Sequence, residues 1–293
     1  MKKVEMSCPA KVNLLLKILG KRQDGFHELL TFMQAIDLTD SLEVWRKSGS
    51  LEFQCDDSSI PKDKSNLVVR AAQLFLKKTN NKESVGLKLV KRIPVAAGLG
   101  GGSSDAATTL LAMNKLFDHP LEQETLSGMA AQLGSDVPFF LTGGAAVCRG
   151  RGEIIAPYRH QENPYFILIN PGIPLSTKEV YEHFHGEYAD RDEAETLLAK
   201  IIEGFTKRDI ALSSKAFSND LEKPAFERMP LLKGLKESLL QSGGLGAMLS
   251  GSGPTVFAVA PDKLAAEQVC ERARKLLRDP AGFRYFVAKA AEQ

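Results

Sequence analysis

Apolar and polar residues alternate along the first part of the chain, which predicts β-structure there. Residues 4–18 place apolar side chains on one face, while Lys11 and Asn13 fall on the opposite face. This pattern predicts either a strand pair or one bent strand. The same period of two predicts further strands at residues 30–36, 41–44 and 85–93, the last of which stops at Pro94.

A helical period follows in several later segments. It predicts helices over residues 66–77, 104–117 and 122–133, with Gly134 placed to end the third, and strands over 145–155 and 165–169. After residues 171–174 the composition shifts, and residues 176–240 are charged and helix-rich. The remainder predicts a glycine-rich segment, a strand, a helix and a last strand, at residues 243–253, 255–259, 264–277 and 283–288.

These elements indicate an α+β protein with two lobes. The order strand, loop, strand, helix, strand near the C-terminus is that of a ferredoxin-like half. We expect an N-terminal lobe over residues 1–160, which carries the glycine-rich loop, and a C-terminal lobe over residues 161–293.

Composition narrows the class of protein without changing this picture. The 293 residues are 43% hydrophobic and 25% charged, as in ordinary globular proteins. Lys and Arg exceed Asp and Glu by 38 − 36 = 2, a balance that does not favour nucleic acid or an anionic membrane as partner. The four cysteines form no CxxC pair, and no apolar run approaches the length of a signal peptide core or a membrane span, so we expect a cytoplasmic protein with reduced thiols.

The segment from Ile93 to Ala107 carries the strongest chemical signal. Four glycines, at 98, 100, 101 and 102, stand between a predicted strand and a predicted helix. Glycines let the backbone approach a ligand closely, and loop amides at a helix N-terminus bind anions. Ser103 and Ser104 add hydroxyls, although either could simply cap the helix. The segment does not fit the Walker A, dinucleotide-binding, protein-kinase or α/β-hydrolase signatures.

Three other segments each allow a functional and a structural interpretation. Lys11 and Asn13 either contact a polar substrate or lie on a solvated strand face. Asp136 either caps a helix with Pro138 in its first turn, or serves as a base or metal ligand. Residues 246–257 form either a tight hairpin turn or a second loop of backbone donors that faces the first.

Taken together and in this order, the four segments resemble the GHMP small-molecule kinase superfamily. Its members have a lysine on the N-terminal strand, a PxxxGLGGSS-type loop, a central acidic motif and a C-terminal glycine-rich motif. The tracts similar to those of the branch that acts on cytidyl-diphosphomethylerythritol in the non-mevalonate isoprenoid pathway are Pro9–Asn13, Asp24–Leu29, Gly134–Phe140 and Asn219–Glu222. The resemblance covers residues 4 to 288.

The resemblance implies roles for particular residues. Lys11 and Asp136 are the expected catalytic pair, with Asp136 as the base. The residues expected to bind nucleotide are Pro94, Val95, Ala96, Ala97, Gly98, Leu99, Gly100, Gly101, Gly102, Ser103 and Ser104 around the phosphates, and Asn66 and Lys91 near the adenine. The residues expected to bind the acceptor are Asn13, Phe26, His27, Thr177 and Tyr181, with residues 251–255 closing the phosphate end.

The resemblance also implies the fold and the cofactors. We expect a two-lobed GHMP kinase fold, with an N-terminal lobe like ribosomal protein S5 domain 2 and a ferredoxin-like C-terminal lobe. The cofactors would be ATP and Mg²⁺, with the metal ligands unassigned, and the protein would act as a monomer or homodimer. Phe26 stands where the family often has tyrosine, which keeps the ring and removes a hydroxyl. The alternatives are a homoserine or mevalonate type of kinase, a catalytically silent binding protein that should have lost Lys11 or Asp136, and an RNA-binding protein, which the charge balance disfavours.

Overall fold

Two long strands, β1 (Lys3–Lys21) and β2 (His27–Lys47), run through most of the fold. The structure, a computed structural model, describes residues 2–160, 163–278 and 281–292. It divides into a first unit of Met1–Ala10, Thr39–Ile93 and Gly100–Gly143, and a second unit of Lys11–Leu38, Pro94–Leu99 and Gly144–Gln293. Both long strands therefore contribute residues to each unit.

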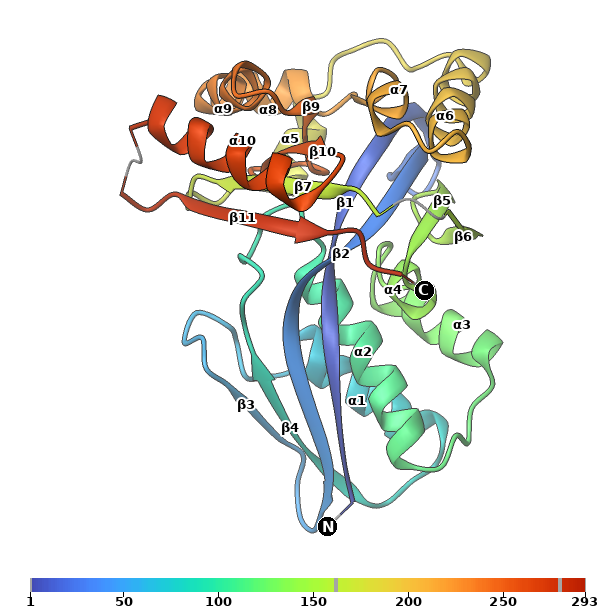
Figure 1. Cartoon of the computed structure of the whole chain (residues 1–293). Coiled ribbons are helices and arrows are strands. Elements are labelled where there is room, and N and C mark those ends of the chain that lie inside the picture. Colours follow the sequence, from blue (N-terminus) through green and yellow to red (C-terminus); the bar gives the residue numbers. More distant parts are fainter. Residues whose placement is uncertain (1, 161–162, 279–280, 293) are drawn as a thin grey trace. The chain divides into compact units, whose positions relative to one another are not determined.

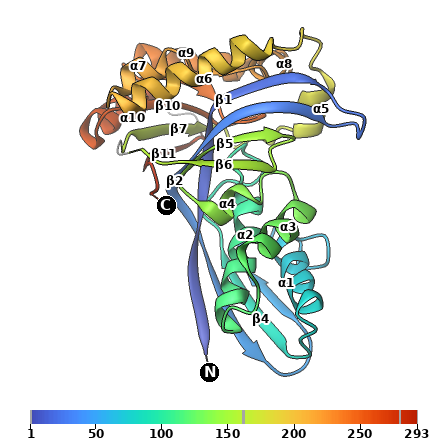
Figure 2. The same cartoon turned by 90° about the vertical axis from the view of Figure 1, so that its right-hand side faces the viewer.

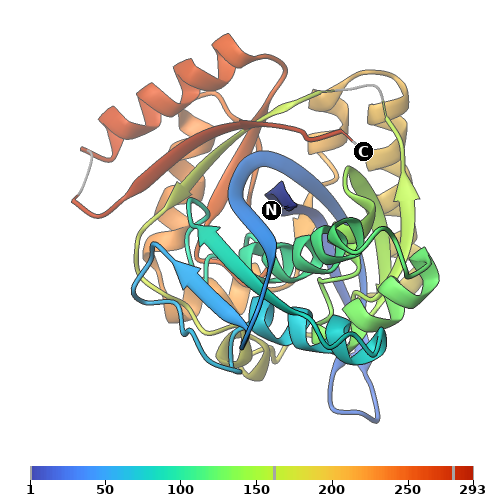
Figure 3. The same cartoon turned by 90° about the horizontal axis from the view of Figure 1, so that it is seen from below.

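In the first unit a small sheet accompanies a group of helices. Strand β4 (Ser84–Val90) pairs antiparallel with residues 41–47 of β2 and parallel with β3 (Glu52–Cys55) (Figure 3). Helices α1 (Leu67–Lys78), α2 (Gly101–Leu116) and α3 (Gln123–Leu133) pack against one another (Figure 2). The short helix α4 (Phe139–Thr142) ends the unit and also contacts α2.

Helix α2 is the most deeply buried helix of this unit. Small residues such as Ala106, Ala107 and Thr109 are buried along it, so α1, α3 and α4 can approach it closely. Close-packed neighbours on several sides leave a helix little freedom to tilt or rotate. The packing therefore holds the N-terminal end of α2, where the glycine-rich loop enters.

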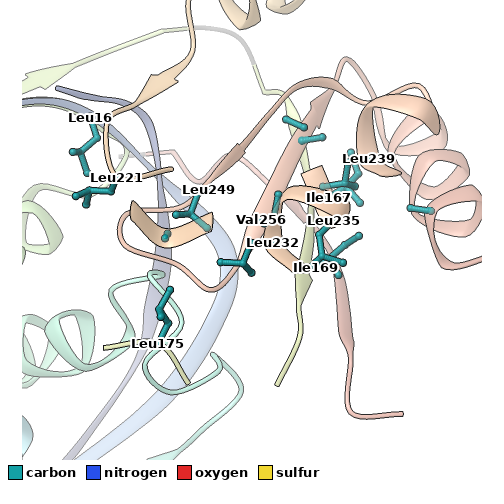
Figure 4. Packing of buried hydrophobic residues seen from close by; sticks show 14 of the residues in the cluster. Leu16, Ile167, Ile169, Leu175, Leu221, Leu232, Leu235, Leu239, Leu249 and Val256 are labelled. Atoms are coloured by element: carbon teal, nitrogen blue, oxygen red, sulfur yellow. The ribbon is translucent and has the colours of Figure 1, made fainter. Parts of the chain in front are cut away.

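The second unit contains an antiparallel sheet in the order β11-β7-β10-β9. Its strands are β7 (Tyr165–Asn170), β9 (Leu245–Leu249), β10 (Val256–Ala260) and β11 (Arg284–Lys289). Helices α9 (Leu231–Gln241) and α10 (Lys263–Leu276) cover one face of this sheet (Figure 1). Between them lies an apolar core to which Ile167, Ile169, Leu235 and Leu239 contribute (Figure 4).

The remaining elements of the second unit are two strands that form a sheet with the first half of β2, and a group of short elements that follows β7 in the chain. Strand β5 (Ala145–Gly150) pairs antiparallel with residues 29–34 of β2 and with β6 (Ile154–Tyr158). The later elements are α5 (Thr177–Glu182), α6 (Arg191–Thr206), α7 (Ile210–Ser214), β8 (Ser218–Asn219) and α8 (Glu222–Arg228). Strand β8 pairs parallel with β1 at Leu15 and Leu16.

The α+β class and the C-terminal order of strands and helix are confirmed, while several boundaries differ from the predictions. Residues 4–18 belong to one strand, and the two predicted strands at 30–36 and 41–44 are one, because the polar residues between them also stay extended. Helix α2 begins at Gly101 rather than near Ser104, so two glycines belong to its first turn. Gly134 follows α3 with an extended φ of 174° and not in the left-handed conformation expected of a helix-ending glycine.

The predicted division at residues 160 and 161 stays a prediction. The two units alternate along the chain, and residues 161–162 lie outside the described part. Within that described part, no helix is long and apolar enough to cross a membrane.

Candidate active site

Residues 94–100 form the loop that leads from β4 into α2, here called the first loop, and three of them have left-handed backbone conformations. Ala96, Gly98 and Gly100 have φ angles of +51°, +74° and +70°. Glycine adopts such angles without steric cost, whereas they are uncommon for alanine. Three such residues within five positions bend the backbone sharply just before α2 begins.

Helix α2 starts without a capping side chain. Gly100 occupies the N-cap position and supplies no side-chain hydrogen bond, so the alternative in which Ser103 or Ser104 caps this helix is wrong. The first amides of a helix lack intrahelical acceptors and carry partial positive charge, which favours bound anions. Gly102 is exposed, and a Cβ there would meet only Leu67, at 3.9 Å. The first turn therefore presents open backbone of the kind that binds a phosphate.

Ser103 and Ser104 differ in their surroundings. Ser103 is partly exposed, whereas Ser104 is fully buried. Among the residues that the structure describes, the Ser104 Oγ has no hydrogen-bond partner. An unsatisfied buried hydroxyl costs free energy, so this oxygen is a group that a bound ligand or water would stabilise.

A second loop, residues 250–255, contacts the first loop directly. The Ser250 hydroxyl donates to the Gly98 carbonyl at 2.9 Å, and the Thr255 amide donates to the Ala97 carbonyl at 3.3 Å. A Cβ at Gly98 would stand 2.1 Å from the Ser250 carbonyl oxygen, so only glycine fits there. Both interpretations of this segment hold: it is the turn of a hairpin, because β9 and β10 pair antiparallel on either side of it, and this turn also contacts the first loop.

Lys11 and Asn13 lie side by side on β1, as the strand period predicts. The Lys11 side chain is only 3% exposed, so the alternative of a solvated strand face is wrong. Its ammonium donates to the Asn13 Oδ1 at 2.6 Å and to the Gly98 carbonyl at 3.0 Å. The Asn13 amide in turn donates to the Thr31 hydroxyl at 2.9 Å. This chain of hydrogen bonds holds the Lys11 ammonium against the first loop.

Asp136 lies in the turn between α3 and α4 and is partly exposed. The N-cap position of α4 is Pro138, and no side-chain capping bond is made there, so Asp136 is not the N-cap residue of α4. Asp136 belongs to the first unit and Lys11 to the second. Their pairing as catalytic residues stays a prediction.

Aromatic residues predicted to bind the acceptor gather where β2 begins. The rings of His27 and Tyr181 are stacked, with centroids 5.2 Å apart and an interplanar angle of 24°. Phe26 is 49% exposed, and the Arg151 guanidinium lies 4.9 Å from its ring centroid. Burial, and then the charge of Lys21, lower the pKa of His27 and favour its neutral form. The site thus combines a stacked pair of rings, His27 and Tyr181, with an exposed Phe26 that lies against Arg151, and the sequence analysis did not single out Arg151.

Side chains from elsewhere in the second unit also hold the second loop by hydrogen bonds, and the sequence did not predict these contacts. The Asn219 amide donates to the Leu249 and Gly251 carbonyls, both at 2.8 Å. The Thr177 and Ser252 hydroxyls are hydrogen-bonded at 2.7 Å, so the predicted acceptor residue Thr177 contacts the loop itself. The tract around Asn219 was noted only for its resemblance, although a buried asparagine at the end of a short strand is typical of a residue whose side chain holds a neighbouring turn.

The two residues predicted near the adenine already have partners in the first unit. Asn66 caps α1: its side chain accepts from the Val68 amide and donates to the Pro61 carbonyl, both at 2.8 Å. The Lys91 ammonium contacts Asp105 at 2.8 Å and also forms an ion pair with Asp40. Contact of Asn66 or Lys91 with a nucleotide stays a prediction.

The cluster around Lys91 titrates abnormally. Burial raises the pKa of Asp105 to about 7, with Lys91 opposing the rise and Asp40 adding to it. Burial lowers the pKa of Lys91, but the charges of Asp105 and Asp40 outweigh it and leave this pKa above its usual value. Burial and the neighbouring carboxylates raise the pKa of the Cys8 thiol, which therefore stays protonated.

Comparison with known proteins matches this site to one family. The family model described as GHMP kinases N terminal domain matches residues 66–144, and the one described as GHMP kinases C terminal matches residues 201–279. The chain is 38% identical to 4-diphosphocytidyl-2-C-methyl-D-erythritol kinase of Gloeobacter violaceus, over 100% of this chain and 96% of the relative. It is 40% identical to the enzyme of that name from Clostridium botulinum, over 89% and 92%.

Solved structures agree. A crystal structure of 4-(cytidine 5'-diphospho)-2C-methyl-D-erythritol kinase, 33% identical, superposes with a TM-score of 0.81 over 99% of this chain and 100% of that one. Homoserine kinase from Cytophaga hutchinsonii gives a TM-score of 0.83 at 20% identity, over 100% and 96%. The second likeness shows the fold alone.

The raised pKa of Asp105 predicts how stability depends on pH. The ordinary value is 3.8 and the folded value is about 7, so between them the folded chain holds a proton that the unfolded chain has released. The stabilisation from this proton is complete below the lower value and is lost as the pH rises through the upper one. Asp105→Asn removes the titration. We expect the Tm of this variant, relative to wild type, to increase from about pH 4 to about pH 7 and to level off above that.

Thermal melts of both proteins across this range provide the measurement. Asp63→Asn is the control, because the Ser65 hydrogen bonds lower the pKa of Asp63 and place its titration below the range. A Tm difference for Asp105→Asn that stays flat or falls with rising pH would contradict the assignment.

Proposed function

This chain belongs to the 4-diphosphocytidyl-2-C-methyl-D-erythritol kinase family of GHMP kinases, and we propose that it transfers the γ-phosphoryl group of ATP to the 2-hydroxyl of 4-diphosphocytidyl-2-C-methyl-D-erythritol. This reaction would serve the non-mevalonate isoprenoid pathway. The observation that carries the proposal is the position of the buried Lys11 ammonium, which donates a hydrogen bond to the Gly98 carbonyl. Gly98 lies in the loop that resembles the family's phosphate loop.

The residues of the first loop and of α2 fit an ATP phosphate chain. The loop bends sharply at Ala96, Gly98 and Gly100, and the first turn of α2 has no capping side chain and an exposed Gly102. Backbone amides arranged in this way bind anions without needing a charged side chain. The unsatisfied Ser104 hydroxyl would gain a partner there. We propose that residues 94–104 hold the phosphates and that Asn66 lies toward the adenine, whereas the Lys91 ammonium is held by Asp40 and Asp105.

A magnesium ion would reach the protein mainly through those phosphates. In the described ranges, no group of three or more His, Cys, Asp or Glu residues could hold a metal ion by itself. Mg²⁺ commonly keeps several waters and binds through phosphates with few protein ligands, so a site without such a cluster still fits this ion. When bound with ATP, the ion supplies neutralisation of charge on the phosphate oxygens. Ser103 and Ser104 are the hydroxyls nearest in sequence that could contact it.

We assign the chemistry of the acceptor to Asp136 and Lys11. The Asp136 carboxylate would accept the proton of the 2-hydroxyl as that oxygen attacks, so that the alkoxide need not form in full. The Lys11 ammonium, fixed by Asn13 and Gly98, would orient and neutralise the reacting groups. Asn13 would place the methylerythritol end. The protein's contribution is thus alignment and electrostatic stabilisation, as in phosphoryl transfer generally.

The aromatic residues fit the cytidyl end of the acceptor. The exposed face of Phe26 can stack on a base without the hydroxyl that a tyrosine would add. A neutral His27 can offer one donor and one acceptor to a base edge. Tyr181 supports the His27 ring by stacking, and Thr177 borders the same segment. We propose that these four residues bind the cytidine.

The same proposal extends to the setting of the enzyme. We propose that it acts in the cytoplasm on this small molecule, as a monomer or homodimer, and without nucleic acid or membrane as partner. The net charge of +2 is in keeping with this. A catalytically silent binding protein is disfavoured because both Lys11 and Asp136 are present.

A panel of alcohols tests the proposed substrate. Purified protein would be incubated with ATP, Mg²⁺ and, separately, 4-diphosphocytidyl-2-C-methyl-D-erythritol, homoserine or mevalonate, and ADP release would be measured. We expect the cytidyl substrate to give the highest kcat/KM by at least about 100-fold, because only it has a base and a diphosphate to contribute binding energy. Comparable kcat/KM on homoserine or mevalonate would refute the assignment.

Asp136→Asn tests the proposed base. Asparagine has the same size but no oxygen that takes up a proton, so we expect kcat to fall by about 10²–10⁴-fold with ATP affinity and Tm close to wild type. Asp262→Asn is the matched control, because Asp262 caps α10 and asparagine caps equally well. Retained kcat in Asp136→Asn would remove Asp136 from the reaction.

A further inference from the structure

A buried group of three charged residues lies at the base of the glycine-rich segment in the first unit. Lys91 is flanked by Asp40 and Asp105, and the exposed fractions of the three side chains are 6%, 0% and 5%. Two carboxylates against one ammonium is a costly arrangement to bury, since apolar residues of the same volume usually do as well or better for stability. Its presence beside the phosphate loop therefore calls for an explanation other than stability.

The cluster fixes the chain where it enters the loop. Asp40 accepts hydrogen bonds from the backbone amides of Arg92 and Ile93, in addition to its ion pair with Lys91. The Lys91 amide donates to the Asp56 carboxylate at 2.8 Å. Three consecutive amides just before Pro94 are thus bound by carboxylates, which leaves this stretch of backbone little freedom.

The same cluster holds the helix that leaves the loop. Asp105 is the fifth residue of α2 and binds the Lys91 ammonium at 2.8 Å. A Cβ at Gly101 would stand 3.3 Å from the Lys91 Nζ and 3.1 Å from the Ile93 Cγ2, so the first residue of α2 packs directly on these side chains. Lys91 therefore connects residues 91–93 with residues 101–105, the segments on either side of the loop, both within the first unit.

We propose that Asp40, Lys91 and Asp105 form a positioning cluster, which sets the separation between the two ends of the phosphate loop and the direction of the first amides of α2. Lys91 acts through its two carboxylates and does not contact the nucleotide. This inference rests on the proposed function in that it takes ATP as the ligand of the loop.

Direct ATP binding distinguishes this role from nucleotide contact by Lys91. The dissociation constant for ATP would be measured by isothermal titration calorimetry on wild type, Lys91→Met, Asp105→Asn and the double variant Lys91→Met/Asp105→Asn. Lys91→Met leaves two buried carboxylates without their cation, and we expect at least about tenfold weaker binding. Asp105→Asn keeps the Lys91–Asp40 pair, and we expect binding within about threefold of wild type.

The double variant gives opposite results under the two roles. If Lys91 acts through the cluster, removing one carboxylate relieves the repulsion, and ATP binding recovers at least about threefold relative to Lys91→Met. If Lys91 contacts the nucleotide, the double variant binds as weakly as Lys91→Met, and Asp105→Asn alone binds ATP more tightly than wild type. Either of those results would overturn the proposal.

Control measurements separate this proposal from general damage and from the proposed function. Lys17→Met breaks the half-buried pair of Lys17 with Asp220 in the second unit and should leave ATP affinity unchanged. In kinetic assays, Lys91→Met should raise KM for ATP and leave KM for the acceptor near wild type. If Lys91→Met does not fold, the double variant decides alone: binding within about threefold of wild type supports the cluster, and weaker binding overturns it. A wild type that does not bind ATP would refute the proposed function and this inference with it, whatever the variants do.

Discussion

The carbonyl oxygen of Gly98 is the point on which the site in the second unit depends. It accepts hydrogen bonds from the Lys11 ammonium and from the Ser250 hydroxyl, one from β1 and one from the second loop. Only glycine fits at this position, because a Cβ would stand 2.1 Å from the Ser250 carbonyl oxygen and the φ angle is +74°. A strand, a phosphate-type loop and a closing loop are therefore joined through one peptide group.

The surrounding side chains make this junction rigid rather than merely close. Asn13 orients the Lys11 ammonium and is itself held by Thr31, while Asn219 binds the carbonyls on either side of Ser250. Burying an ammonium is expensive and requires partners such as the Asn13 Oδ1 and the Gly98 carbonyl. A lysine kept in such a place is typical of a group whose charge is needed at a defined position. This is the physical basis for assigning Lys11 to the reaction.

Local sequence patterns predicted much of this arrangement. The period of two placed Lys11 and Asn13 on one strand face, and the run of glycines between a strand and a helix indicated the anion-binding loop. The start of α2 was predicted three residues late because glycines are typical of loops, whereas Gly101 and Gly102 are helical here and Gly101 lies close to the Ile93 and Lys91 side chains. Asp40, Lys91 and Asp105 could not be grouped from sequence, since 51 and 14 positions separate the two carboxylates from the lysine and no motif links them. The role of Asn219 escaped for the same reason: its partners lie 30 and 32 positions away.

The ATP affinity of Gly98→Ala tests most directly whether this peptide group organises the nucleotide loop. Its Cβ would stand 2.1 Å from the Ser250 carbonyl, so the two loops would have to separate. Gly49→Ala is the matched reference, because Gly49 has a similar φ of +84° with nothing within 4 Å of the added atom. We expect Gly98→Ala to bind ATP at least about tenfold more weakly than Gly49→Ala, equivalent to about 1.4 kcal/mol. Equal ATP dissociation constants for the two variants would contradict the account.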